Sequence, residues 1–279
     1  MSHPIPTLTT TGSLPSGADA TVGDHYTFGD GGDAAERLAL LAAVFEPSSA
    51  RLLRLLGYLQ PRQAVDLGCG PGWSTRLVHA VLAPARTLGL ERSPQQVARA
   101  RAMAPPGVEY QVRDVTEAAF PGERRPDLLY SRFLLTHLRD PDEVVAAWGR
   151  AAADRAVLVL EETADMLSEH PAFARYYQLV AELQAAYGQC LRVGAALAGP
   201  FAGWTTELSL LSPLSLPATR MARLHALNIA TWRNDPYARA AFDGDELDRL
   251  AASLAAIADH DEPAPPVRVV MRQLVLAKP

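Results

Sequence analysis

Cysteine is scarce in this sequence, which has only Cys69 and Cys190 among its 279 residues. Two cysteines give no disulfide framework, and neither belongs to a pattern with the spacing of a zinc site. The histidines other than His137 are scattered along the chain: His3, His25, His79, His170, His225 and His260. We therefore expect no bound metal.

The sequence also lacks a long hydrophobic run and an excess of basic residues. No apolar stretch is long enough to span a bilayer, and no secretory leader is recognised, so we expect a cytoplasmic protein with no membrane partner. The formal net charge is -5 and no basic patch stands out, which argues against a nucleic-acid partner. With 48% hydrophobic and 20% charged residues, the composition is that of a globular enzyme.

Composition and periodicity divide the chain into five segments. Residues 1–20 are rich in Pro, Thr, Ser and Gly and are predicted to form a flexible tail. Residues 21–60 form an N-terminal segment with two predicted helices and a break near Pro47. The remaining segments are a core that carries the ligand motifs (61–163), a mostly helical cap (164–232), and a C-terminal helix with a closing strand (233–279).

Short apolar runs alternate with helical patterns throughout the core. Strands are predicted at 64–67, 87–90, 108–112, 128–130 and 156–160, with helices at 74–82, 94–103 and 142–153. This alternation predicts an α/β fold with a doubly wound, mostly parallel sheet and ligands at the carboxyl ends of its strands. Beyond the core, helices are predicted at 170–187, 219–232 and 245–258, and strands at 208–216 and 267–276.

The clearest motif is Asp-Leu-Gly-Cys-Gly-Pro-Gly at residues 66–72, between a predicted strand and a predicted helix. Glycines let a ligand approach the backbone, and a helix N-terminus offers free N–H groups to an anion. A dinucleotide fingerprint needs a further glycine at the sixth position counted from Gly68, where this sequence has Trp73. The motif therefore argues against a nicotinamide dinucleotide.

Polar residues end the next three predicted strands. Glu91 ends the second strand, where an acid can accept hydrogen bonds from both hydroxyls of a ribose. Asp114 follows the third strand, where an acid can accept from an adenine amino group, and Ser131 ends the fourth. Each residue alone has an ordinary structural explanation, as a surface charge, a loop cap or a turn. Together, at one edge of the sheet, they indicate a nucleoside site.

Residues 26–162 resemble the class I S-adenosylmethionine-dependent methyltransferases, in the small-molecule branch related to ubiquinone/menaquinone methyltransferases. Residues 66–72 match the first motif of that family, Glu91 its ribose-binding acid, 113–115 its adenine-contacting segment and 127–141 its fourth motif. The resemblance implies a Rossmann-like fold with S-adenosylmethionine as cofactor. The cofactor-binding residues that it implies are Tyr26, Asp66, Gly68, Cys69, Gly70, Glu91, Arg92, Asp114, Val115, Ser131 and Arg132.

Other methyltransferase classes fit the sequence less well. Enzymes that methylate DNA amino groups carry an Asn- or Asp-Pro-Pro-aromatic element after the fourth strand, where this sequence has Ser-Arg-Phe-Leu at 131–134. Cytosine C5 enzymes need a Pro-Cys nucleophile, and neither cysteine follows a proline. Metal-assisted, catechol-type methylation needs acids near the fourth strand, against which Ser131 argues.

The acceptor is expected to be small and largely apolar or aromatic. The cap leaves the sheet after the fifth strand, on its ligand edge, and its first helix has Phe173, Tyr177, Val180 and Tyr187 roughly on one face. Packing explains Phe173 and Val180, whereas Tyr177 and Tyr187 are candidates to line the acceptor site, as is Glu162 at the end of the fifth strand. Trp204 and Trp232 are further candidates for an aromatic cover.

His137 is the candidate catalytic base. It lies downstream of the fourth strand, and an imidazole titrates near neutral pH. A structural histidine is the alternative, because transfer from a reactive sulfonium can proceed by positioning alone.

Three functions are consistent with these residues. The first is methylation of O, N or C of a small molecule in natural-product (antibiotic) biosynthesis. The second is a methyltransferase of primary metabolism, such as quinone biosynthesis, and the third is a related protein that uses the cofactor for a non-methylating role. The oligomeric state is left open, with a homodimer as one option.

Overall fold

The computed structural model describes residues 32–117, 120 and 125–279. The predicted tail at 1–20 and the predicted cofactor contact Tyr26 lie outside these residues. Within the described ranges, no helix combines the length and the apolar character that crossing a membrane requires.

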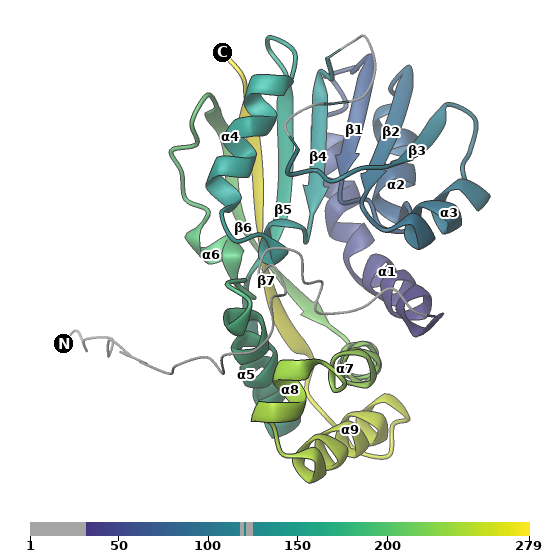
Figure 1. Ribbon diagram of the computed structural model, residues 1–279, viewed down its shortest axis with the longest axis vertical. Coiled ribbons are helices and arrows are strands. Elements are labelled where there is room, and N and C mark those ends of the chain that lie inside the picture. Colours follow the sequence, from purple (N-terminus) through teal and green to yellow (C-terminus); the bar gives the residue numbers. More distant parts are fainter. Residues whose placement is uncertain (1–31, 118–119, 121–124) are drawn as a thin grey trace, which may run out of the picture.

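A seven-stranded sheet forms the centre of the molecule, in the order β3-β2-β1-β4-β5-β7-β6 (Figure 1). The strands are β1 (Gln63–Leu67), β2 (Arg86–Glu91), β3 (Val108–Val112), β4 (Leu128–Arg132), β5 (Val157–Leu167), β6 (Thr205–Leu216) and β7 (Val267–Ala277). The first five pair in parallel, whereas β7 runs antiparallel to both β5 and β6. The predicted α/β fold with a mostly parallel sheet is confirmed.

Helices cover both faces of the sheet, as a doubly wound fold requires (Figure 1). Apolar residues of α1 (Gly32–Leu55) and α2 (Trp73–Leu82) pack on one face. Residues of α4 (Pro141–Ala151) and the short α6 (Val193–Ala196) pack on the other. Because both faces are covered, all five residues of β1 are buried, including the polar Gln63 and Asp66.

The helix starts follow the local sequence. The side chain of Ser93 caps α3 (Pro94–Ala102) by accepting from the Gln96 N–H at 3.3 Å, and Pro94 takes the first helical position. Asp140 caps α4 in the same way at the Glu143 N–H, 3.1 Å away. A short oxygen-bearing side chain followed by proline satisfies an end N–H and presets the first helical φ.

One N-terminal helix, α1, replaces the two helices predicted with a break near Pro47. Proline removes one backbone hydrogen bond from a helix interior, which made a break the simpler prediction. Buried residues on both sides of Pro47 anchor the continuous helix instead: Phe45 packs against the cap, and Leu52 and Leu53 pack against the sheet. Tertiary packing therefore outweighs the local preference.

The cap gathers at one end of the sheet, below β5, β6 and β7 in Figure 1. Helices α5 (Pro171–Ala186) and α7 (Ala218–Trp232) of the predicted cap pack around one apolar cluster with α8 (Pro236–Ala241) and α9 (Gly244–Ala258) of the predicted C-terminal segment, and these four helices are together called the cap from here on. Strand β5 runs past its predicted end at residue 160, because β7 continues to pair with it as far as Leu167. The long β5, β6 and β7 therefore tie the cap to the sheet.

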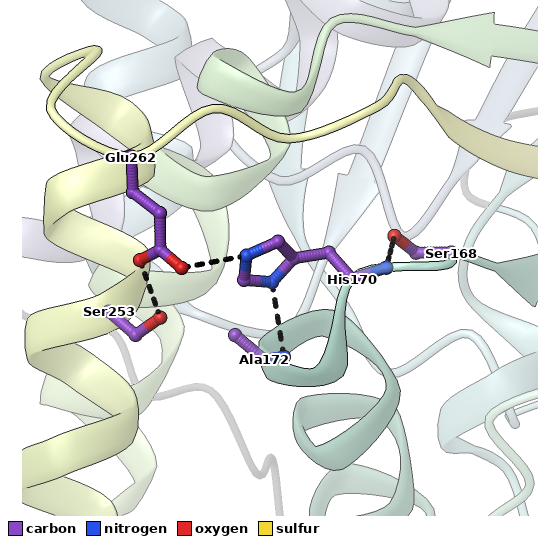
Figure 2. A network of polar contacts seen from close by, with 5 residues as sticks. All are labelled: Ser168, His170, Ala172, Ser253 and Glu262. Carbon is purple, nitrogen blue, oxygen red and sulfur yellow. Dashed lines mark hydrogen bonds and ion pairs between the residues drawn. The ribbon is translucent and has the colours of Figure 1, made fainter.

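His170 fixes the start of α5 (Figure 2). Its Nδ1 accepts from the Ala172 N–H at 3.3 Å, so the ring proton is on Nε2, which donates to Glu262 at 2.9 Å. Ser253 of α9 donates to the other oxygen of Glu262 at 3.1 Å, and Ser168 accepts from the His170 N–H at 3.2 Å. This network holds α5 against α9.

Candidate functional site

A cavity of about 340 Å³ lies between the carboxyl ends of the parallel strands and the cap. This volume is near the lower end of the range for small-molecule sites, which is roughly 300–1,000 Å³. The loops after β1, β2, β3 and β4 form one end of the wall, and α1, α5 and α7 form the other. Ligand-binding edge and cap therefore share one cavity.

The loop after β1 is a backbone cradle. Gly68, Gly70 and Gly72 all have positive φ, at 69°, 52° and 82°, a conformation that other residues adopt at a cost. A Cβ on Gly72 would collide with the Tyr110 hydroxyl, so the loop packs closely on β3. A Cβ on Gly70 would meet no protein atom within 4 Å, and Gly70 lines the cavity. The open side of the cradle therefore faces the ligand space.

Asp66 supports this loop from behind. Its carboxylate is buried and accepts from the hydroxyls of Ser74 and Thr75, both at 2.6 Å. Burial raises the pKa of Asp66 to about 6. Asp66 is not among the residues that line the cavity. The prediction of a direct cofactor contact is corrected to a positioning role, in which the carboxylate joins β1 to the first turn of α2.

Glu91 stands at the cavity wall at the end of β2. One carboxylate oxygen accepts from the Gly70 N–H at 3.1 Å, and the other accepts from the Ser93 N–H at 2.9 Å. The same side chain therefore fixes the glycine loop and the turn into α3, and it lines the cavity beside them.

The other predicted cofactor residues divide into two groups. Most of them line the cavity: Gly68, Cys69, Arg92, Asp114, Val115 and Arg132. Asp114 is held by Thr116, whose N–H and hydroxyl donate to it at 2.8 and 2.7 Å. Ser131 is fully buried inside the sheet and does not reach the cavity, because strand alternation turns its side chain into the core. Its predicted cofactor contact is therefore corrected.

His137 lines the cavity from a 3-10 turn, η1 (Leu135–His137), directly after β4. Desolvation, with a smaller contribution from the positive charge of Arg37, lowers the pKa of His137 to about 4. The imidazole is therefore neutral at pH 7 and is a weak base. The structure places His137 where the sequence predicted it and leaves its role in catalysis a prediction.

Glu162 holds η1 in place and does not line the cavity. It is fully buried, and one carboxylate oxygen accepts from the Leu135 N–H at 2.7 Å. The other oxygen has no hydrogen-bond partner. Burial raises the pKa of this carboxyl to about 8. Its predicted contact with the acceptor is corrected to support of the turn that carries His137.

Tyr177 and Tyr187 also lie away from the cavity wall, contrary to prediction. The Tyr177 hydroxyl is 3.0 Å from His225 Nε2 within the cap, and the Tyr187 hydroxyl donates to Asp235 at 3.0 Å. Trp204 donates to the carbonyl of Val145 in α4, and Trp232 packs in the apolar cluster of the cap. These aromatic residues stabilise the cap and its junction with the sheet.

The cap residues that do reach the cavity were missed from the sequence. They are Tyr176, Val180 and Gln184 of α5, with Met221, Leu224, His225 and Asn228 of α7, and Met166 and Leu191 outside these two helices. In α5 they have the spacing i, i+4, i+8, which places them on one stripe of the helix. The signal available was the polar Gln184 on this stripe.

These residues suit S-adenosylmethionine. The cradle at Gly70 is open where a Cβ would otherwise project, which leaves room for a ligand against the backbone. Glu91 offers carboxylate oxygens suited to ribose hydroxyls, and Asp114 offers one suited to an adenine amino group. The glycine cradle could therefore hold the amino-acid part of S-adenosylmethionine, and the two acids could hold its nucleoside part.

Residues 64–155 match the family model of the methyltransferase domain. This part of the chain is a methyltransferase domain. This match confirms the family predicted from the sequence, whose cofactor is S-adenosylmethionine. A trans-aconitate 2-methyltransferase of Methylobacterium radiotolerans is 40% identical over 92 residues, covering 33% of this chain and 34% of that protein. One from Methylobacterium nodulans is 36% identical over 129 residues, covering 46% and 48%.

A solved structure extends the likeness of the methyltransferase fold to most of the chain. A candidate type II methyltransferase from Anaeromyxobacter dehalogenans superposes with a TM-score of 0.52 at 21% identity. It covers 82% of this chain and 95% of that one. The two sequence relatives, by contrast, are matched over about a third and about a half of their length. The shared part is therefore the fold and the methyltransferase domain.

Proposed function

We propose that this chain transfers a methyl group from S-adenosylmethionine to a small-molecule acceptor held under the cap. The observation that carries the proposal is one cavity lined both by Gly70 and Glu91 at the strand ends and by Val180 and Leu224 of the cap helices. A donor and an acceptor bound at its two ends would meet inside it.

The chain's own residues hold and enclose the reactants. Gly68, Gly70, Glu91 and Asp114 would hold the cofactor, which when bound supplies a methyl group activated by a sulfonium. Apolar walls keep water away from the space between the two ends: Leu38, Leu41, Phe45, Phe133, Val180, Met221 and Leu224. Excluding water and fixing the acceptor in line are the main contributions that such a site makes.

His137 is proposed to orient the acceptor. A pKa of about 4 keeps the imidazole neutral at pH 7, so its ring nitrogens can accept or donate a hydrogen bond. The same low pKa makes removal of a proton from a phenol or an amine unfavourable. The general-base role predicted from the sequence is therefore the less favoured of the two.

The second candidate function is methylation of a carboxylate acceptor of primary metabolism. The sequence relatives named above are trans-aconitate methyltransferases, and Arg37 lines the cavity and is largely buried. These observations favour a carboxylate. Natural-product biosynthesis in the cytoplasm, the first prediction from the sequence, stays a prediction.

Product formation from labelled cofactor tests the proposal. The full chain is incubated with S-adenosylmethionine labelled in the methyl group, together with either trans-aconitate or a set of phenols and aromatic amides. Labelled aromatic product is the expected result, and labelled trans-aconitate ester would establish the second candidate. If S-adenosylhomocysteine binds but neither set is methylated, the non-methylating role replaces the proposal.

A further inference from the structure

The cap end of the cavity contains buried polar atoms that have no hydrogen-bond partner among the described residues. Gln184 of α5 is fully buried, and neither its amide oxygen nor its amide nitrogen forms a hydrogen bond. Gln184 also lines the cavity. An unsatisfied buried amide is costly, so most such groups in folded proteins are paired.

Two residues of α7 each have one polar atom of this kind. Asn228 donates from Nδ2 to the Tyr176 hydroxyl at 2.7 Å, while its Oδ1 has no partner. His225 Nε2 lies 3.0 Å from the Tyr177 hydroxyl, while its Nδ1 has no partner. Both residues are at least nine-tenths buried and line the cavity with Gln184. Unpaired polar atoms from two helices therefore line the same cavity.

This polar group is uncharged. Burial lowers the pKa of His225 to about 3, so its ring is neutral, and its face stacks on Tyr176 with centroids 4.0 Å apart. Across the described residues of α5 and α7, no charged side chain lines the cavity. Arg37 of α1 is the nearby charge on the wall, and it has interactions of its own within the protein.

We propose that Gln184, Asn228 and His225 form the acceptor-recognition site and select an uncharged group with a donor beside an acceptor. A primary carboxamide, a lactam or an imide has this arrangement. Gln184 offers both kinds of atom, so it matches such an edge with two hydrogen bonds. Val180, Met221 and Leu224 border the same space with apolar atoms and suit the rest of the molecule.

The inference rests on the proposed function, because it names the acceptor class of the same cavity. It explains why unsatisfied polar atoms are kept in the cap: a site built to hydrogen-bond an acceptor discriminates strongly against analogues that leave its groups unpaired. The same feature should lower the stability of the protein without acceptor. Replacing Gln184 by an apolar residue should therefore not lower the stability, whereas replacing a glutamine that only supports the fold would lower it.

Benzamide, benzoate and toluene are probes of equal ring size that differ at this group. Their dissociation constants are measured by saturation-transfer NMR with the full chain saturated with S-adenosylhomocysteine. Benzamide is expected to bind about tenfold more tightly than either of the others, the effect of one net hydrogen bond. Benzoate binding as tightly as benzamide would overturn the inference in favour of an anion site.

Gln184→Met keeps the side-chain length and removes both polar atoms. It should weaken benzamide about tenfold, leave toluene unchanged and leave the melting temperature equal to or above that of the parent. Gln178→Met is the matched control, because Gln178 lies on the exposed face of the same helix and should change none of these values. Unchanged benzamide binding, or a lower melting temperature, in Gln184→Met contradicts the inference.

The two proposals fail in different ways. If S-adenosylhomocysteine does not bind the parent chain in calorimetry, the proposed function fails. If it binds equally to the parent and to Gln184→Met while the two proteins bind benzamide alike, only the acceptor inference fails.

Discussion

The strand end of the cavity offers carboxylates that the protein itself holds in place, whereas the cap helices offer uncharged polar side chains. At the strand end, hydroxyl groups hold Asp66 and backbone N–H groups hold Glu91, although Asp66 Oδ1 and both amide atoms of Gln96 have no partner among the described residues. At the cap end, Gln184 has no partner for either amide atom, and Asn228 and His225 each keep one atom without a partner. Both ends are enclosed by the same fold, so the difference concerns what each end is built to bind.

Pairing inside the protein fixes a shape before the ligand arrives. The carboxylates of the strand end hold the glycine loop, so cofactor binding there needs little reorganisation. Polar atoms left unpaired at the cap end instead lower the stability of the protein and reward a matching acceptor. On the proposed function, the strand end would hold the cofactor and the cap end would select the acceptor.

Glu162 tests whether a buried polar group with an unpaired atom lowers the stability of the protein. Of the four substitutions proposed, its replacement is expected to change the free energy most. Its folded-state pKa of about 8 lies above the ordinary value of 4.5, so the folded protein favours the protonated form. The resulting destabilisation is absent below pH 4.5, grows as the pH rises and is complete above pH 8. Glu162→Gln should raise the free energy of unfolding by about 4 kcal/mol at pH 8.5 and change it little at pH 4.5.

Chemical denaturation at the two pH values measures this difference. Glu117→Gln is a suitable control, because Glu117 is exposed and forms only a surface ion pair with Arg113. A gain in Glu162→Gln that is the same at both pH values would show that the buried charge is not its cause.

Glu91→Ala tests the strand end. It removes the acceptor of two loop N–H groups and the carboxylate proposed for the ribose. We expect S-adenosylhomocysteine to bind about 100-fold more weakly, or about 3 kcal/mol, in calorimetry. Glu109→Ala is the control: it removes an exposed carboxylate of β3 that pairs with Arg86, and it should leave the affinity for S-adenosylhomocysteine unchanged. Equal affinities in all three proteins would remove Glu91 from the cofactor site.

His137→Gln distinguishes positioning from base catalysis at the boundary between the two ends. With a pKa of about 4, His137 stays neutral from pH 6 to pH 9, so it should add no inflection to the pH profile of kcat in that range. Loss of an orienting hydrogen bond should lower kcat about tenfold. A loss of more than about 100-fold with a changed pH profile would restore the general base.

Tyr187→Phe should have the smallest effect. It removes the hydroxyl that donates to Asp235, on a residue that does not line the cavity. The free energy of unfolding should fall by about 1 kcal/mol, and the KM for the acceptor should not change. A raised KM with unchanged stability would return Tyr187 to the acceptor site.

The strand end could be predicted because its residues are tied to local sequence. The loop at 68–72 has positive φ at three glycines, Glu91 is the last residue of β2, and Asp114 lies two residues after the end of β3. The positioning role of Asp66 could not be predicted in the same way. The sequence motif has an acid at this position whether its carboxylate supports the glycine loop or contacts the ligand.

The cap end was harder to predict because α5 is apolar on more than one side. Phe173 and Tyr177 pack into the cap, whereas Tyr176 and Val180 line the cavity. Helical periodicity gives the stripes but not which stripe meets the cavity, since that depends on how α5 crosses α7 and β5. The continuous α1 shows the same limit, because distant packing on both sides of Pro47 decides its course.

Calorimetric titration of the full chain with S-adenosylhomocysteine and, separately, with NAD tests the central claim most directly. The open cradle at Gly70 and the acid at Glu91, with Trp73 in place of the dinucleotide glycine, predict a single site for S-adenosylhomocysteine and no binding of NAD. Binding of NAD without binding of S-adenosylhomocysteine would contradict it.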